Sequence, residues 1–169
     1  RDRVRVNAYM ETSVPGIYAF GDLASPYQLK HIANAEARLI SKQLVGGAKT
    51  PMVYDGGPHA IFSYPQVASV GLTERTAQQG GVDYVTASRK YADTAYGWAR
   101  EDTDSFVKVV ADPTTRQLLG AHIIGPQASL LIQPLVQGMK YGQTVDEMAQ
   151  VIYIHPALTE VVEQALLEL

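Results

Sequence analysis

The chain has 169 residues, 46% of them hydrophobic, which is enough for one main buried core and a small appendage. Its 14 Lys and Arg against 17 Asp and Glu give a net charge of −3 without a basic cluster, which argues against nucleic acid as a partner. The absence of cysteine excludes disulfides, thiolate nucleophiles and cysteine-ligated metals within this chain.

The hydropathy of the chain does not indicate a membrane protein. No apolar run approaches the roughly 20 residues that cross a bilayer, and the N-terminal stretch RDRVRVNAYM lacks the apolar core of a signal peptide. We therefore expect a cytoplasmic protein without a membrane partner. Because the sequence has no starting Met and begins in mid-pattern, we also expect it to be a piece of a longer chain.

The first part of the chain predicts a strand, a turn and a helix. Residues 17–20 read as a short, mostly apolar strand that ends at the turn formed by Gly21 and Asp22. Apolar residues then recur at helical spacing over residues 29–44, and a Gly-Gly pair follows. This pair ends the predicted helix.

A polar, glycine-rich stretch at 46–58 is interpreted as a linker that divides the chain. We expect residues 1–48 to form one unit and residues 49–169 a second. In the second unit, short apolar runs between turn residues predict strands, and longer periodic runs predict helices. The expected strands lie at 59–65, 67–73, 82–91, 105–112 and 117–125, and the expected helices at 73–81, 128–142, after Thr144 and from Thr159.

The order of these elements indicates the fold class. The polar turn DPTTR joins the last two expected strands as an antiparallel hairpin. Strands clustered before helices, without strict alternation, indicate an α+β domain with a largely antiparallel sheet and helices packed on one face. Thr73 is expected to cap one helix, and Thr144 with Glu147 forms a capping-box pattern before another.

The Gly21-Asp22 turn is the first candidate site. A strand that ends there and leads into a helix near Gln28 places a carboxylate beside free backbone N–H groups. Such a place suits a polyol and the edge of an anionic ring. Asp22 can equally be a local cap at the end of a strand, and the dipeptide alone favours that alternative.

His155, in a His-Pro pair before the last helix, is the second candidate. Pro156 disfavours helix at His155 and permits a cis peptide, while Glu160 falls in the first turn of the helix. A carboxylate bound to one imidazole nitrogen fixes the tautomer and leaves the other nitrogen for acid/base work near neutral pH. The alternative is a turn histidine with a satisfied hydrogen bond and a glutamate that only complements the helix dipole. Spacing alone favours this alternative.

The remaining histidines and aromatic residues give weaker signals. His122 lies in an expected strand and is interpreted as a half-buried packing residue, and His31 and His59 have no companions at metal-ligand spacing. We therefore expect no metal site. The aromatic stretch 91–98 lacks interleaved basic residues, so it is interpreted as a packing or interface surface.

Four motifs occur in a fixed order along the chain. They are VPGIYAFGDLASPYQLKHIANAEA, AIFSYPQVASVGLTE, LLGAHIIGPQASLLIQ and IHPALTEVVEQAL. Together they resemble the C-terminal third of the FAD-dependent pyridine nucleotide-disulfide oxidoreductases, and the resemblance covers essentially the whole chain. The resemblance implies the dimerisation (interface) domain of that family, preceded by the strand-turn-helix end of its FAD-binding domain.

Some segments also indicate a branch of this family. AYGWARED, GPQASLLIQPL and IHPALTEVVEQALL are similar to the branch that reduces the disulfide of mycothiol. Dihydrolipoamide dehydrogenases usually carry a second histidine at the position of Tyr153, and Thr159 stands where proline or serine is expected. The dihydrolipoamide dehydrogenases, or another related member, remain the alternative.

The resemblance implies roles for the candidate residues. Gly21 and Asp22 would contact FAD, with Asp22 holding the ribityl hydroxyls. The next helix start would face the flavin pyrimidine edge and stabilise negative charge there. His155 would be the acid/base of dithiol-disulfide exchange, with Glu160 as its orienting partner. The residues of the helix start are Gln28, Leu29, Lys30 and His31.

The resemblance also implies what lies outside this chain. In the family, the redox cysteine pair and the glycine-rich FAD fingerprint belong to the N-terminal region, so FAD and NADPH, or NADH, would be bound mainly by segments that this sequence lacks. We expect this piece to be inactive alone. It would form a homodimer in which His155 serves the partner's site, where a small-molecule disulfide is reduced.

A non-enzymatic alternative is a stand-alone oligomerisation module without redox activity. Such a module would need none of Asp22, His155 and Glu160, so their presence together argues against it.

Overall fold

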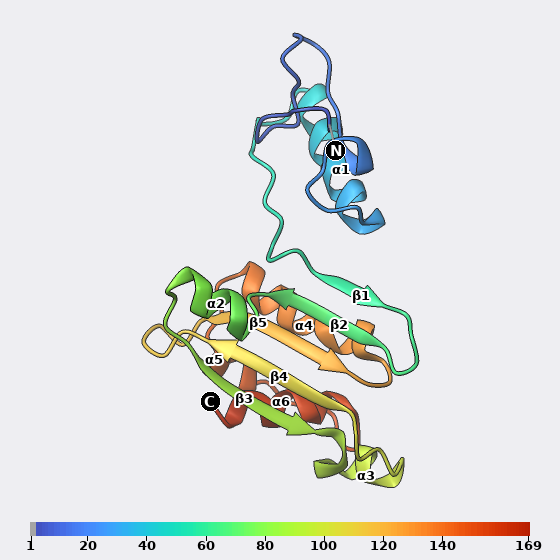
Figure 1. Ribbon diagram of the computed structural model, residues 1–169, viewed down its shortest axis with the longest axis vertical. Coiled ribbons are helices and arrows are strands. Elements are labelled where there is room, and N and C mark those ends of the chain that lie inside the picture. Colours follow the sequence, from blue (N-terminus) through green and yellow to red (C-terminus); the bar gives the residue numbers. More distant parts are fainter. Residues whose placement is uncertain (1–2) are drawn as a thin grey trace. The chain divides into compact units, whose positions relative to one another are not determined.

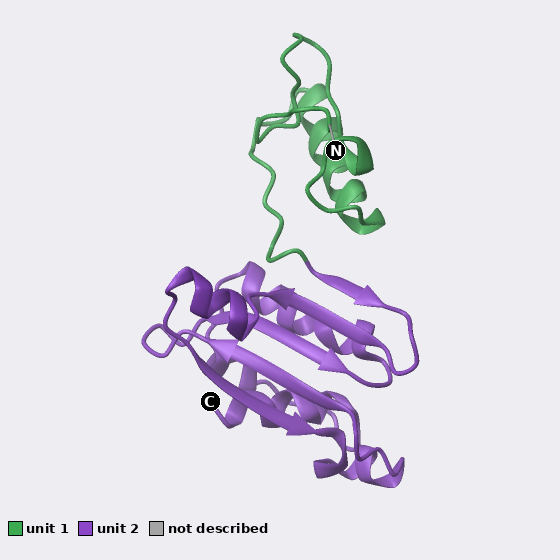
Figure 2. Cartoon of the chain, in the orientation of Figure 1, with its two compact units in different colours: residues 1–57 green, residues 58–169 purple. Residues whose placement is uncertain are grey.

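The computed structural model describes residues 3–169 and divides the chain into two compact units, residues 1–57 and residues 58–169 (Figure 2). The first unit contains the short 3-10 helix η1 (Gly21–Leu23) and helix α1 (Lys30–Leu44). The expected strand at 17–20 is wrong, because the chain makes only an isolated antiparallel bridge there, between Glu11 and Tyr18. An apolar run becomes a strand only where a neighbour supplies a continuous ladder of backbone partners.

Helix α1 confirms the periodicity read from the sequence. Ile32 and Ile40 are buried on its packed face, as their spacing predicted. Glu36 lies between them on the same face and is fully buried as well. This face of α1 therefore contains a carboxylate in an otherwise apolar row.

The stretch interpreted as a linker contains no helix or strand, and much of it packs along the first unit. The Met52 amide donates to the Ala8 carbonyl at 2.7 Å, and Lys49 forms an ion pair with Glu11 at 2.8 Å. These contacts fix the segment that precedes the second unit.

The second unit is built on one sheet of five strands in the order β1-β2-β5-β4-β3, with every pair antiparallel. All five strands were predicted, and the α+β fold class is confirmed. The strands are β1 (His59–Ile61), β2 (Val67–Gly71), β3 (Val85–Lys90), β4 (Phe106–Ala111) and β5 (Leu118–Ile124). The helical segments are α2 (Glu74–Gly80), η2 (Tyr91–Asp93), α3 (Ala95–Ala99), α4 (Ala128–Lys140), α5 (Val145–Ala149) and α6 (Thr159–Leu167).

One face of the sheet forms the core. Side chains alternate across a strand, so Val70, Val107, Val109 and Ile123 all point to the same face and are almost completely buried. Helix α4 packs on β1, β2 and β5, while α6 packs on β3 and β4 (Figure 1). The last two long helices thus cover the whole width of this face.

The opposite face carries a row of polar side chains. Ser69, His122 and Lys108 lie side by side across β2, β5 and β4, in the register that pairs them. Helix α2 lies on this side, where Glu74 forms an ion pair with Lys108 at 2.6 Å (Figure 1). The prediction of helices on one face therefore holds for α4 and α6, and α2 is the exception.

Local signals in the sequence explain where several elements begin. The Thr73 hydroxyl accepts from the Thr76 amide at the start of α2, and Thr144 and Glu147 form the predicted capping box before α5.

In the aromatic stretch, Tyr91 is fully buried and its hydroxyl donates to the Pro126 carbonyl at 3.1 Å. Within residues 3–169, none of the helices combines the length and the apolar character that crossing a bilayer requires.

Two neighbouring leucines of α6 test how the sheet core is held. Leu166 is 1% exposed and Leu167 is 67% exposed. We expect Leu166→Ala to lower the free energy of unfolding by about 2–5 kcal/mol, because it leaves a cavity against the sheet. The matched change Leu167→Ala should alter it by less than about 1 kcal/mol. Urea unfolding followed by circular dichroism measures both values, and equal losses would contradict the packing of α6.

Candidate functional site

The loop before α6 brings His155 and Glu160 together. The His155–Pro156 peptide is cis, a conformation that the proline permits, and His155 Nδ1 lies 2.8 Å from Glu160 Oε1. The second carboxylate oxygen of Glu160 accepts from the Ala157 amide at 2.9 Å. The carboxylate thus binds the imidazole with one oxygen and the loop backbone with the other.

The two members of this pair differ in exposure. The His155 side chain is 68% exposed, whereas the Glu160 side chain is 13% exposed. The hydrogen bond from His155, followed by that from the Ala157 amide, holds the pKa of Glu160 below its usual value. An ionised carboxylate therefore orients an imidazole that solvent, or another molecule, can reach.

The packing of α6 explains why Glu160 is well placed. Val161 and Val162 follow it directly and are buried against the sheet, and Leu158 is buried just before the helix. Glu160 therefore sits at the start of a helix whose opposite side is fixed in the core. The rigid support of the pair comes from this helix and not from the loop alone.

Exposed apolar side chains lie next to His155 in the sequence. Ile152 is 99% exposed and Ile154 is 75% exposed, and Val151 is also exposed. Single exposed apolar residues are common, but a group of three beside a polar pair is a typical feature of an interaction surface.

The first unit contains the other predicted site. Gly21 is buried with φ of +64°, and a Cβ at this position would lie 3.4 Å from the Ala33 Cβ of α1. A left-handed backbone in close contact with a helix favours glycine. Asp22 follows in η1 and is exposed. The turn thus packs against α1 and presents a carboxylate at the surface.

The start of α1 lies slightly later than predicted. The helix begins at Lys30 with Leu29 as its N-cap, and no side chain caps its first amides. Gln28 precedes the helix and is exposed, and so are Lys30 and His31. A helix start without a side-chain cap leaves backbone N–H groups for another acceptor.

Sequence reasoning missed two residues of this site, Glu36 and Tyr54. Glu36 Oε2 accepts from the Gly21 amide at 2.7 Å, and Glu36 Oε1 accepts from the Tyr54 hydroxyl at 2.9 Å. A glutamate in the apolar stripe of a helix was the only signal that could have marked this position. Tyr54 lies in the stretch interpreted as a linker, where no pattern indicated it.

The other predicted residues take structural positions. His122 is half-buried, with Nδ1 2.5 Å from the Ser69 hydroxyl and Nε2 3.0 Å from the Leu72 carbonyl. Burial lowers the pKa of His122 below its usual value. Among the residues that the structure describes, no three His, Asp or Glu side chains are grouped in a way that could hold a metal ion.

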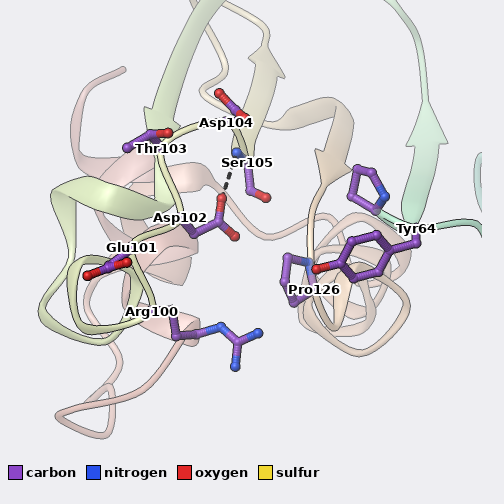
Figure 3. Close-up of a pocket in the computed structure, with 9 residues that line it drawn as sticks. Tyr64, Arg100, Glu101, Asp102, Thr103, Asp104, Ser105 and Pro126 are labelled. Atoms are coloured by element: carbon purple, nitrogen blue, oxygen red, sulfur yellow. Dashed lines mark hydrogen bonds between the residues drawn. The ribbon is translucent and has the colours of Figure 1, made fainter.

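A pocket of about 260 Å³ lies elsewhere in the second unit. Residues 100–105 form one side of it, and Tyr64 and Pro126 the other (Figure 3). The Ser105 amide donates to Asp102 Oδ1 at 3.0 Å within this lining (Figure 3). None of the site residues predicted from the sequence lines the pocket. The structure thus brings His155 to Glu160 and Gly21 to α1, in different compact units.

Residues 57–166 match the family model of the pyridine nucleotide-disulphide oxidoreductase dimerisation domain. The chain belongs to this family, and its five-stranded sheet with α4 and α6 is that domain.

Known relatives and a solved structure agree with this assignment. Mycothione reductase from Mycobacterium tuberculosis is 50% identical over 173 residues, which cover 99% of this chain and 38% of the relative. Dihydrolipoyl dehydrogenase from Corynebacterium glutamicum is 37% identical, covering 98% and 36%. The crystal structure of LpdA from Mycobacterium tuberculosis matches with a TM-score of 0.92 at 25% identity, covering 98% and 36%. The chain spans less than two fifths of the length of each of these proteins.

The contact between Tyr54 and Glu36 predicts a dependence of stability on alkaline pH. Burial, followed by the hydrogen bond to Glu36, raises the pKa of Tyr54 to about 12, against about 10 in an unfolded chain. The stabilisation is complete below about pH 10 and is lost as the pH rises toward 12, because only the unfolded state releases the proton in this range. We expect the free energy of unfolding of Tyr54→Phe to fall less steeply than that of the wild type between these pH values. Urea unfolding at several pH values measures the two slopes, and parallel slopes would contradict the contact.

Proposed function

We propose that this chain is the C-terminal part of a flavin-dependent disulfide reductase that uses NADPH or NADH to reduce the disulfide of mycothiol. In this proposal, residues 1–48 belong to the FAD-binding domain and residues 49–169 to the dimerisation domain. The 50% identity to mycothione reductase over 99% of the chain supports the substrate class, while the overlap with only 38% of that relative leaves the rest of the enzyme outside this chain.

The observation that carries the proposal is the pair of His155 and Glu160. Thiol-disulfide exchange needs a thiolate as the attacking species and a proton for the thiol that leaves. With Nδ1 engaged by the Glu160 carboxylate, Nε2 of His155 can take a proton from one thiol and return it to another. Glu160 stabilises the imidazolium that forms in between, because its carboxylate is ionised and close.

The described residues fit the flavin cofactor that the family uses. The tight Gly21 turn and the exposed Asp22 carboxylate provide an acceptor for hydroxyl groups, and α1 begins without a side-chain cap. Asp22 would hold the ribityl hydroxyls, and the α1 amides near Lys30 and His31 would face the pyrimidine edge. When bound, FAD carries two electrons from the nicotinamide to the disulfide.

The catalytic histidine would serve a second copy of the chain. His155 is exposed and lies beside exposed Val151, Ile152 and Ile154, so a partner covering this surface would bury apolar area and bring its disulfide to the imidazole. The match to a dimerisation domain supports this arrangement. Trp98, 74% exposed in α3, adds another apolar side chain for such contacts.

A substrate comparison with the complete enzyme tests the proposal. NADPH and NADH oxidation would be followed with mycothione, glutathione disulfide and lipoamide in turn. We expect the highest kcat/KM with mycothione. A preference for lipoamide would indicate a dihydrolipoamide dehydrogenase instead. No turnover by the flavin-loaded protein would favour an oligomerisation module that has lost the redox reaction.

The role of His155 predicts a large kinetic effect. We expect His155→Ala in the complete enzyme to slow disulfide reduction by roughly 10²-fold or more, as loss of a general acid/base does. Steady-state NADPH oxidation at saturating disulfide measures the change.

His59→Ala is the matched control, because His59 is an exposed histidine at the start of β1 in the same unit. It should retain activity within about threefold of the wild type. If His155→Ala also stays within threefold, His155 is not the acid/base.

A further inference from the structure

Glu36 is a buried carboxylate whose two oxygens have different partners. It has no exposed surface, and its oxygens accept from the Gly21 amide at 2.7 Å and from the Tyr54 hydroxyl at 2.9 Å. Burying a carboxylate is unfavourable unless hydrogen bonds compensate for the lost water. An apolar residue between Ile32 and Ile40 would fill this face of α1 without that cost. The carboxylate therefore has a task that packing alone does not explain.

The task concerns the peptide units around Gly21. The Gly21 carbonyl accepts from the Ser25 amide at 2.7 Å and from the Ala24 amide at 2.9 Å, so η1 fixes this side of the residue. Glu36 fixes the other side by accepting the Gly21 N–H. Gly21 has a left-handed φ of +64° and no side chain, so these hydrogen bonds determine its orientation. Asp22 is the next residue, and its position depends on that orientation.

Tyr54 holds the carboxylate in place. Its ring lies 5.2 Å from the ring of Tyr27, measured between centroids, so the hydroxyl approaches Glu36 from a fixed direction. A carboxylate held at both oxygens cannot rotate away from the Gly21 amide. The hydrogen bonds link segments that are 15 and 18 residues apart in the sequence.

We propose that Glu36 is the positioning residue of the cofactor-binding turn, and that Tyr54 locks its carboxylate against the Gly21 amide. This inference rests on the proposed function, because it assigns the ligand of the turn to FAD. Glu36 does not touch the cofactor in this scheme. Glu36 determines the position of Asp22 relative to the start of α1. Because both would contact FAD, this position determines the affinity for FAD.

The test uses the complete enzyme and compares Glu36→Ala, Glu36→Gln and Tyr54→Phe. The dissociation constant for FAD is measured by flavin fluorescence during titration of the deflavinated protein. We expect a rise of roughly 10-fold or more for Glu36→Ala, because a hydrogen bond to a charged group is lost. Glu36→Gln should lie between wild type and Glu36→Ala, since its amide oxygen can accept from the Gly21 N–H and its NH2 group can donate to the Tyr54 oxygen, but neither bond then involves a carboxylate. Tyr54→Phe should show a smaller rise in the same direction.

A second readout separates positioning from general damage. With FAD at saturation, kcat of each variant should return to within about twofold of the wild type, because the catalytic pair in the other unit is unchanged. The effects of Glu36→Ala and Tyr54→Phe should not add in the double variant, since both act through one carboxylate. Additive effects, or a kcat that excess FAD does not restore, would overturn the proposal.

Glu11→Gln is the matched control in the same unit. Glu11 is partly exposed and forms an ion pair with Lys49, and it has no contact with Gly21. Its dissociation constant for FAD should equal that of the wild type within twofold. An equal rise in Glu11→Gln and Glu36→Ala would show a general loss of structure in this unit instead of positioning.

Hydrogen exchange distinguishes failure of this inference from failure of the proposed function. In the deflavinated complete enzyme, the Gly21 amide should exchange faster in Glu36→Ala than in the wild type, whatever ligand the turn binds. If exchange accelerates but the wild type does not bind FAD, the proposed function fails and the hydrogen-bond arrangement stands. Tyr54→Phe keeps the ring and removes only the hydroxyl. If the wild type binds FAD, and if Tyr54→Phe changes neither the exchange of the Gly21 amide nor the affinity for FAD, the locking role of Tyr54 is wrong. If Glu36→Ala folds and behaves as the wild type in both measurements, the positioning role of Glu36 is wrong.

Discussion

The alternation of side chains along β2, β5 and β4 is the constraint on which the second unit depends. The register pairs Ser69 with His122 and His122 with Lys108, so these three side chains lie on one face of the sheet. The residues that precede and follow each of them along its strand therefore point to the other face. On these three strands that face is apolar, and α4 and α6 pack on it. A slip of one residue in β5 would bring His122 into the core and move Ile123 to solvent, so the register is strongly specified.

The same packing makes the candidate acid/base possible. An imidazole that must meet another molecule has to be exposed, yet it must keep a fixed orientation. The structure meets both needs by dividing them between two residues: Glu160 lies at the start of a helix that packs on the core, and His155, in the loop before this helix, is exposed to solvent. Orientation is thus supplied by the hydrogen bond to the Glu160 carboxylate, and access by exposure of the ring.

Local patterns carried most of the fold prediction. Capping residues such as Thr144, the helical spacing of Ile32 and Ile40, and the hairpin turn between β4 and β5 are all encoded within a few residues. The strand expected at 17–20 failed because a strand depends on a partner that its own sequence does not reveal.

The candidate sites also differ in whether their contacts are encoded by neighbouring residues or depend on residues distant in the sequence. The spacing of His155 and Glu160 was compatible with an acid/base pair and with a turn histidine next to a helix-dipole glutamate. The family resemblance favoured the acid/base pair. The contacts of Glu36 were missed because its partners lie 15 and 18 residues away and become neighbours only after α1 has packed. A buried glutamate in a helix is visible in the sequence only as an interruption of an apolar stripe.

The two outer strands of the sheet have a consequence for how copies of the chain can associate. β1 has three residues, and the chain turns away soon after it at a proline that has no N–H to offer. β3 carries Arg89 and Lys90 at its end, and charged edge strands discourage a neighbour from adding a further strand. Assembly by continuing the sheet from molecule to molecule is therefore disfavoured, which guards against open-ended fibres. Contact between copies is left to surfaces formed by side chains, which can close on themselves as a discrete pair.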